Sequence, residues 1–497
     1  MTKQVFVILA ILSIFTHPAY AYREHKFSTH KINITEAVDN IVMQDINGDK
    51  LPDIVIQTNK KLNIFLQTKE HEFRQAPDQI IYLADTTFLW YIGKVADSDL
   101  PSIFTMTSNG ISRYRQNVGS FVSEPDELIA APNILQGITS QPPLFIDFIP
   151  DINRDGLNDA ILFQKGKLLI FIQNKLGNFS LNQKLDIEME SSVDAISITK
   201  QETVSKISIP ALSFGDLNGD DRIDITYFQF LPKGEKVRFF LQDSNGRFKQ
   251  KENVAHELSP KEKHSKTFFD IEKAPIIQDI NGDGVLDLVV TYLKKGRVLI
   301  YFLKGGRQNL ATPDSIIETG GWVTVVWLND FDGDGKQELI LANIEKFGIV
   351  GGIEVFLSKK VNLQLIVYRL KSDGSGFEND PSQTLVFSVP FVVQLTRESG
   401  SWSLTFKPNF KGDFNGDGIK DLIVKSDDKV LDIYYGNKNT VLDSSPNAKI
   451  NINQPKGTSY TESYTSDLNG DGISDLILLH VNMDKDTNTI ELLLSGK

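Results

Sequence analysis

The chain of 497 residues contains no cysteine, so no disulfide holds its loops and no cysteine is available as a metal ligand or lipid anchor. Its seven histidines form no pattern typical of a zinc site or of an activated nucleophile. No cluster of lysine and arginine occurs, and the net charge of −12 argues against a nucleic-acid partner, because phosphates need a basic surface. Another device must therefore stabilise the loops.

Apolar runs long enough to cross a membrane are also missing beyond the N-terminus. Residues 1–21 combine Lys3, an apolar run from Val5 to Leu12 and the small residues Ala19 and Ala21, which is the pattern of a cleaved secretory signal. An uncleaved membrane anchor is the alternative. We expect residues 22–497 to form the mature chain, a single domain that is secreted or periplasmic and has no membrane span.

An acidic pattern of nine residues, Asp-x-Asn/Asp-x-Asp-x-x-x-Asp/Glu, recurs seven times along the chain. The copies are DINGDKLPD from Asp45, DINRDGLND from Asp151, DLNGDDRID from Asp216, DINGDGVLD from Asp279, DFDGDGKQE from Asp330, DFNGDGIKD from Asp413 and DLNGDGISD from Asp467. Each copy precedes a β-rich run such as Leu288–Val290, and a second run with aromatics follows. Four short antiparallel strands repeated about every 50 to 65 residues are typical of a propeller blade. The sequence therefore predicts an all-β fold, a β-propeller of four-stranded blades.

The spacing of the copies also predicts the number of blades. Between Asp45 and Asp151 the interval doubles, and the segment from Tyr91 to Phe121 keeps the strand pattern but has lost the acidic loop at Asp97–Asp99. Counting this degenerate unit gives eight blades, and seven remain the alternative. The segment His25–Ile34 is predicted to complete the last blade beside Thr489–Leu494, which closes the ring and leaves no open sheet edge.

Five oxygen donors at positions 1, 3, 5, 7 and 9 of a tight loop suit a hard cation that takes six to eight oxygen ligands, which is calcium. Magnesium demands stricter geometry, and the loops lack the histidine and cysteine that transition metals prefer. An EF-hand is excluded because Val290 stands where its bidentate glutamate belongs and the flanks are β-rich. The predicted Ca²⁺ ligands, in up to seven sites and with the main-chain carbonyl used at position 7, are Asp45, Asn47, Asp49, Leu51 and Asp53; Asp151, Asn153, Asp155, Leu157 and Asp159; Asp216, Asn218, Asp220, Arg222 and Asp224; Asp279, Asn281, Asp283, Val285 and Asp287; Asp330, Asp332, Asp334, Lys336 and Glu338; Asp413, Asn415, Asp417, Ile419 and Asp421; and Asp467, Asn469, Asp471, Ile473 and Asp475.

The seven copies differ at positions that affect metal binding. We expect weaker or altered binding where Lys50 or Asp221 replaces the turn glycine and where Glu338 replaces the final aspartate. Acidic turns without a metal are the alternative, but three or four carboxylates within nine residues repel one another strongly unless a cation neutralises them.

These units resemble the FG-GAP or VCBS repeat, the blade of the integrin alpha-subunit propeller and of many exported bacterial proteins. Phe214, Gly215 and Asp216 preserve the Phe-Gly start of that repeat, and the resemblance covers about residues 25–497. It implies structural calcium between the first two strands of each blade. It also implies a protein or glycan ligand on the opposite face, where we expect the insertions His256–Lys266, Ile344–Leu363 and Ser372–Trp402.

A binding or adhesion scaffold without catalytic residues is therefore expected. No G-x-S-x-G, Walker loop, dinucleotide fingerprint or H-E-x-x-H occurs. A polysaccharide lyase or hydrolase stays open as the alternative, because propellers also carry enzymes. Trp90, Trp322 and Trp327 are expected to pack within blades, whereas Trp402 follows Gly400 and Ser401 and is expected to face a ligand.

Overall fold

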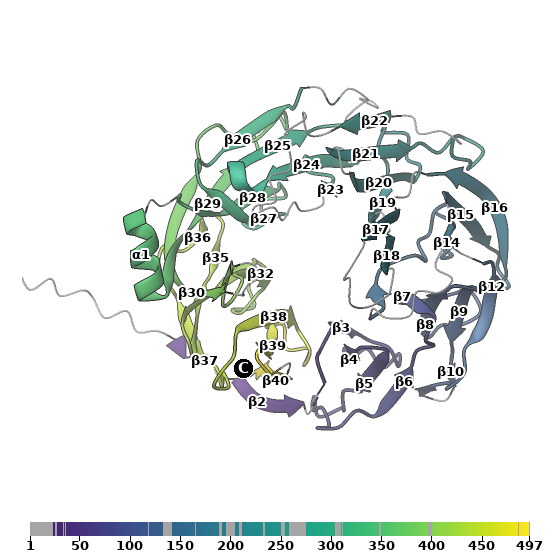
Figure 1. The fold of residues 1–497 in the computed structure, drawn as a ribbon, viewed down its shortest axis with the longest axis horizontal. Helices are drawn as coiled ribbons and strands as arrows, with labels where there is room; N and C mark the ends of the chain where they lie inside the picture. The colour runs from purple at the N-terminus through teal and green to yellow at the C-terminus, as the bar shows by residue number, and fades with distance from the viewer. Residues whose placement is uncertain are drawn as a thin grey trace, which may run out of the picture.

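The computed structural model describes residues 23–24, 27–32, 34, 36–117, 119–132, 142–164, 166–187, 191–194, 204–207, 211–231, 234–249, 254–257, 275–303, 310, 312–346, 349–395, 400–485 and 487–496. These residues form a ring of small antiparallel sheets, an eight-bladed β-propeller (Figure 1). The prediction of an all-β propeller with eight blades is confirmed, and the seven-bladed alternative is wrong. The predicted signal at residues 1–21 lies outside the described residues. No helix in the described ranges has the length and apolarity needed to cross a membrane.

The blades, numbered 1 to 8 in chain order, each place their first strand near the centre and their later strands toward the rim (Figure 1). Blades 1 to 4 consist of β3 (Asn40–Gln44), β4 (Asp53–Thr58), β5 (Lys61–Phe65) and β6 (Gln79–Tyr82); β7 (Thr87–Gly93), β8 (Ser102–Thr107), β9 (Gly110–Tyr114) and β12 (Asp126–Ala130); β14 (Ala160–Gln164), β15 (Lys167–Gln173) and β16 (Phe179–Asp186); and β19 (Ala211–Gly215), β20 (Asp224–Leu231), β21 (Gly234–Phe240) and β22 (Val254–Glu257). Blades 5 to 8 consist of β23 (Ile276–Gln278), β24 (Asp287–Tyr292), β25 (Arg297–Tyr301) and β26 (Ser315–Glu318); β27 (Trp322–Asn329), β28 (Glu338–Ile344), β29 (Lys360–Arg369) and β30 (Gln383–Leu395), extended by β31 (Gly400–Leu404); β32 (Asn409–Gly412), β33 (Asp421–Asp427), β34 (Val430–Tyr434) and β37 (Ala448–Asn451); and β38 (Tyr460–Ser466), β39 (Asp475–Asn482), β40 (Thr487–Ser495) and β2 (Phe27–Ile32).

Several shorter segments add to these sheets or lie between them. In blade 3 residues 146–150 take the innermost place, where the Phe148 carbonyl accepts a hydrogen bond from Ile161 N (2.9 Å). The remaining elements are β1 (Arg23–Glu24), which pairs with β37; β13 (Leu144–Phe145), which pairs with β7; the hairpins β10 (Gln116–Asn117)/β11 (Ser120–Phe121), β17 (Ser191–Asp194)/β18 (Val204–Ile207) and β35 (Gly436–Asn437)/β36 (Val441–Leu442); and the helices η1 (Leu293–Lys295) and α1 (Ile349–Ser358).

The second strand of each blade is the most deeply buried. Every residue of β4, β8 and β28 is buried, because neighbouring blades cover both faces of a propeller sheet. This explains why these strands have continuous apolar runs in place of the alternation of a half-exposed strand. Trp90 is fully buried and donates to the Gln57 side chain of the preceding blade (2.7 Å), which confirms that it packs within the ring. Trp322 and Trp327 pack against a core cluster as expected, and the Trp402 side chain lies outside the description.

The apolar cores lie between blades. Separate clusters join blade 4 to blade 5, blade 5 to blade 6, blade 6 to blade 7 and blade 7 to blade 8. The ring is closed by the same means, since Ile41, Ile54 and Phe65 of blade 1 share one cluster with Ile477 and Ile490 of blade 8.

The first and last segments of the chain meet in blade 8. Strand β2 pairs antiparallel with β40 from Phe27–Ser495 to Ile32–Ile490, and Ile32 is buried in the closing cluster (Figure 1). The predicted closure by the N-terminal segment is therefore confirmed.

Two of the predicted insertions lie in blade 6. The segment Ile344–Leu363 contains α1 between β28 and β29. Within Ser372–Trp402, the run Thr384–Leu395 belongs to β30, the fourth strand of the blade. Residues 372–382 connect the third and fourth strands of that blade, so they emerge on the same face as the acidic loops, whereas α1 emerges on the opposite face. Most of His256–Lys266 lies outside the described residues.

Removing β2 should open the ring. We expect a chain that starts at residue 35 to lose at least about 3 kcal/mol of unfolding free energy, since the β40 edge loses its hydrogen bonds and Ile32 its burial. A chain that starts at residue 26 lacks only β1 and is the matched control, because β1 adds two residues to an outer edge. Urea denaturation compares them, and equal stabilities would contradict closure by β2.

Candidate metal centre

The seven acidic loops lie on one face of the ring. Each loop connects the innermost segment of its blade to the second strand, and this connection emerges on the same side in every antiparallel blade. Its ninth residue begins the second strand in six blades and immediately precedes it in blade 3. The strands thereby place all seven predicted ligand sets at equivalent positions.

Neighbouring loops are joined by hydrogen bonds. The position-8 residues Leu286 and Ser474 donate their main-chain N–H groups to the carbonyls of Asp216 and Asp413 in the preceding loops, both at 2.7 Å. The position-8 side chain of Gln337 donates in the same way to the Asp279 carbonyl (2.5 Å). The position and shape of one loop are therefore coupled to those of the next.

Within each loop the acidic side chains organise the turn. The position-1 carboxylate accepts the N–H of position 6 at 2.7–3.0 Å in all seven copies, and the position-5 carboxylate accepts the N–H of position 7 at 2.8–3.1 Å. Lys50 and Asp221 keep this geometry with φ angles of 72° and 63°, a left-handed conformation that usually favours glycine. The two copies that lack the turn glycine therefore adopt the common loop shape.

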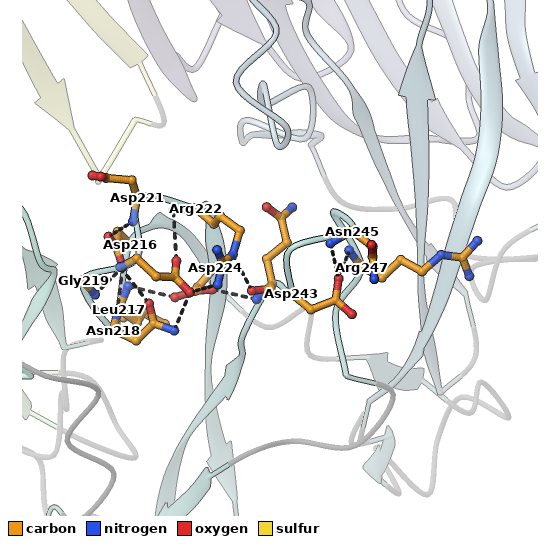
Figure 2. Close-up of polar contacts among 12 residues, drawn as sticks. Asp216, Leu217, Asn218, Gly219, Asp221, Arg222, Asp224, Asp243, Asn245 and Arg247 are labelled. Atoms are coloured by element: carbon orange, nitrogen blue, oxygen red, sulfur yellow. Dashed lines mark hydrogen bonds and ion pairs between the residues drawn. The ribbon is translucent and has the colours of Figure 1, made fainter.

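The position-3 side chain links the donor groups to one another. In five loops the asparagine amide donates to the position-5 carboxylate, for example Asn218 to Asp220 at 2.9 Å (Figure 2). In blade 8, Asn469 instead donates to the Ser495 carbonyl (2.7 Å). The predicted donors at positions 1, 3 and 5 are thus brought together within each loop.

The ninth residue has a second role that sequence reasoning missed. Asp287 is fully buried, and its two carboxylate oxygens accept the N–H groups of Ile280 (3.0 Å) and Leu303 (3.1 Å), which joins the loop to the end of the third strand. The position-2 N–H is bound in this way in all seven loops, and the third-strand N–H in six. We call this arrangement the position-9 clamp.

Burial raises the pKa of the clamp residues. The pKa rises to about 6 for Asp53, Asp159 and Asp224, and to about 7 for Asp287 and Asp421. Burial raises the pKa of Glu338 to about 8 and also raises that of Asp475. The other carboxylates of each loop add to the shift in the first six, so the loops hold negative charge that is costly to bury without a cation.

Blade 6 has the densest set of acids. Ligand atoms of Asp330, Asp332 and Glu338 lie within 4.8 Å of one another, so this cluster could hold a metal ion, and among the described residues only this group of three meets that distance. Burial raises the pKa of Asp332, while the nearby Arg369 guanidinium opposes that shift. A cavity of about 540 Å³ lies beside the loop and is bordered by Asp334, Lys336, Glu338 and Arg369.

The histidines provide no alternative centre in the part of the chain that the structure describes. His480 is buried in β39, where its ring contacts Thr461 Oγ1 (2.9 Å) and Glu491 Oε2 (3.2 Å). Glu491 also accepts the N–H of Asn453 at 2.9 Å. This network joins blades 7 and 8, and its members Thr461, His480 and Glu491 are buried.

The clamp predicts different effects of two substitutions in one loop. In the presence of chelator, Asp287→Ala should lower the unfolding free energy by about 2 kcal/mol, because two buried N–H groups lose a charged acceptor. Asp283→Ala is the matched control, and it should cost less than about 1 kcal/mol because Asp283 is exposed. Urea denaturation measures both, and equal losses would rule out the clamp.

Comparison with known proteins gives one family. The model described as FG-GAP-like repeat matches residues 279–341, from the acidic loop of blade 5 into the second strand of blade 6, and residues 413–478, from the acidic loop of blade 7 into the second strand of blade 8. No curated protein sequence matches.

Among solved structures, the chain is similar to an Agrocybe aegerita lectin whose title describes recognition of non-reducing terminal N-acetylglucosamine. The two share 16% identity and a TM-score of 0.41, and the match covers 83% of this chain and 98% of that chain. It is also similar to two crystal structures of BBS1N in complex with ARL6DN, soaked with mercury and with lead, both at 11% identity with 95% of this chain and 98% of that chain covered, and with TM-scores of 0.38 and 0.37. The predicted family resemblance is confirmed: the chain carries FG-GAP-like repeats arranged as an eight-bladed β-propeller.

Proposed function

We propose that the protein is an exported, calcium-stabilised propeller that serves as a rigid scaffold for binding a partner protein. The observation that supports calcium is the repetition of one oxygen-rich loop geometry in seven blades, each with a buried carboxylate at position 9. Bound calcium would neutralise the carboxylates of its loop and join them through shared coordination.

The residues present fit such an ion. In blade 5, Asp279, Asn281 and Asp283 would contribute side-chain oxygens, and each is already oriented by a main-chain N–H within the loop. Asp287 would contribute from the buried side while it keeps the loop attached to the third strand. Each carboxylate oxygen has a second lone pair, so these hydrogen bonds and coordination are compatible.

Calcium removal should destabilise the protein in a pH-dependent way. Without metal, burial raises the pKa of the clamp carboxylates from the ordinary values of 3.8 for aspartate and 4.5 for glutamate to about 6 to 8, so they bind protons more tightly in the folded state than in the unfolded state. Their contribution to the stability of the metal-free form is therefore greatest below about pH 4 and is lost as the pH rises through 6 to 8. Calcium needs the deprotonated form, so its contribution grows over the same range.

The difference in Tm between calcium and chelator should accordingly be at least about 10 °C at pH 8 and small at pH 5. Thermal unfolding at both pH values measures it, with magnesium in place of calcium as the control ion. No difference in Tm at pH 8 would exclude structural calcium.

The observation that favours a protein partner is the surface of α1. This helix emerges on the face opposite the acidic loops, and Phe356 and Leu357 are 62% and 75% exposed on it. Val355 anchors the helix by packing against the core of blade 6. Large apolar side chains on an anchored, exposed helix are typical of a contact surface for another protein, because leaving them in water is unfavourable.

Paired variants test this surface. Phe356→Ser combined with Leu357→Ser should abolish retention of a partner from extracts of the producing cell, with no change in Tm. Leu176→Ser is the matched control, because Leu176 is 78% exposed in the β15–β16 turn on the acidic-loop face. A partner lost equally with both variants would contradict the proposal, as would retention of a glycan alone or turnover of a polysaccharide.

A further inference from the structure

Arginine side chains occupy the acidic-loop face of three blades. In blade 6, Arg369 at the end of β29 donates through Nη2 to Asp332 Oδ2 at 2.5 Å, and Asp332 is only 1% exposed. The same Nη2 also reaches the carbonyls of Lys438 (3.3 Å) and Asn439 (3.2 Å) in blade 7. The guanidinium therefore pairs with one carboxylate of the blade 6 loop and joins the loop to the next blade.

Blade 4 carries its arginine inside the loop. Arg222, at position 7, forms an ion pair through Nη2 with the position-5 carboxylate of Asp220, and its Nε donates to the Gln242 carbonyl at 2.9 Å (Figure 2). The N–H of Gln242 in turn donates to the clamp residue Asp224 (2.8 Å). Arg222 thus holds a loop carboxylate and the end of the third strand together, which is the connection that a coordinated ion would otherwise provide.

In blade 2 the loop has lost the acidic pattern, and an arginine from the third strand pairs with the first of its remaining acids. Arg113, in β9, binds Asp97 through two hydrogen bonds, from Nη1 at 2.6 Å and Nη2 at 2.9 Å. Arg113 is 5% exposed, and its hydrogen bonds lower the pKa of Asp97. A buried arginine with one carboxylate here connects strand and loop without the remaining acids.

The loops of blades 1, 3, 5, 7 and 8 differ from these three. Among the described residues, no arginine or lysine forms an ion pair with a carboxylate of these five loops. Lys50 and Arg154 lie within two of these loops, and neither pairs with a loop carboxylate. In the described part of the chain, these carboxylates therefore have no basic side chain that could take the place of a metal ion.

We propose that Arg113, Arg222 and Arg369 take the place of calcium in blades 2, 4 and 6, so that only blades 1, 3, 5, 7 and 8 bind calcium tightly. This inference rests on the proposed calcium function and specifies which loops bind the ion. A guanidinium stays charged at any physiological pH, and a divalent ion on the same carboxylate would lie a few ångströms from it and be repelled. Calcium would have to displace Arg369 from Asp332 and from two carbonyls of blade 7.

The pairing with Arg369 also explains why Asp330, Asp332 and Glu338 can lie so close together. It is the densest group of acids in the described loops, and it is also the one that Arg369 enters. A group of three acids is stable there because the arginine already supplies positive charge. We expect calcium affinity in blades 4 and 6 to be at least about 100-fold weaker than in the other five loops.

Native mass spectrometry at about 10 µM free calcium tests this by counting bound ions. Five ions support the inference. Seven ions would overturn it while leaving the calcium function intact, and no bound ion would overturn the calcium function itself.

Substitution of acids separates the two classes of loop without removing any arginine. Asp283→Asn in blade 5 should lower the count from five to four, whereas Asp332→Asn in blade 6 and Asp220→Asn in blade 4 should leave it at five. A loss of one ion in Asp332→Asn or Asp220→Asn would contradict the inference.

Removal of the arginine should create a site. Arg222→Gln is the safer variant, because Arg222 is partly exposed and the clamp of blade 4 does not depend on its side chain, and it should raise the count to six. Arg297→Gln is the matched control, since Arg297 pairs with Glu318 away from any loop. An Arg222→Gln protein that unfolds with the wild-type Tm in chelator yet still binds five ions would overturn the exclusion by arginine.

Discussion

In seven of the eight blades a carboxylate is buried at the start of the second strand, and its burial determines the other interactions of the acidic loops. The second strand is the most enclosed strand of its blade, and an acid placed there loses most of its hydration. The chain compensates with two main-chain N–H groups in the position-9 clamp, which stabilise the negative charge and fix the loop at the same time. The raised pKa values show that these hydrogen bonds do not fully offset burial. A nearby cation completes the compensation, and in our account this cation is calcium in some blades and arginine in others.

The same loops connect the ring from blade to blade. Apolar clusters join the faces of adjacent sheets, but on the acidic-loop face the blades meet through hydrogen bonds from position 8 to the preceding loop. Order in one loop therefore depends on order in its neighbours, so metal binding should stabilise the ring as a unit. The pairing of β2 with β40 and the apolar cluster shared by blades 1 and 8 close the ring, and α1 lies on the face opposite the acidic loops.

Much of this arrangement could be predicted from the sequence, because its signals are local. The acids have fixed positions within each loop, the eighth blade follows from the doubled interval after Asp45, and β2 follows from the missing fourth strand of the last unit. The clamp was missed because its third-strand N–H partners lie 14 to 20 residues away along the chain. The pairing of Arg369 with Asp332 requires the register of β28 and β29, which composition does not specify. The helix α1 was missed because its glycines and β-branched residues have low helix propensity, and packing of Val355 on blade 6 overrides it.

An anomalous-scattering map from crystals grown with calcium would show which loops bind the ion, since it locates each ion among the carboxylates. We expect anomalous peaks within the loops that begin at Asp45, Asp151, Asp279, Asp413 and Asp467, each in contact with the position-1 and position-9 side chains. A map without peaks at these loops, with their carboxylates hydrogen-bonded only to main-chain N–H groups, would contradict this expectation.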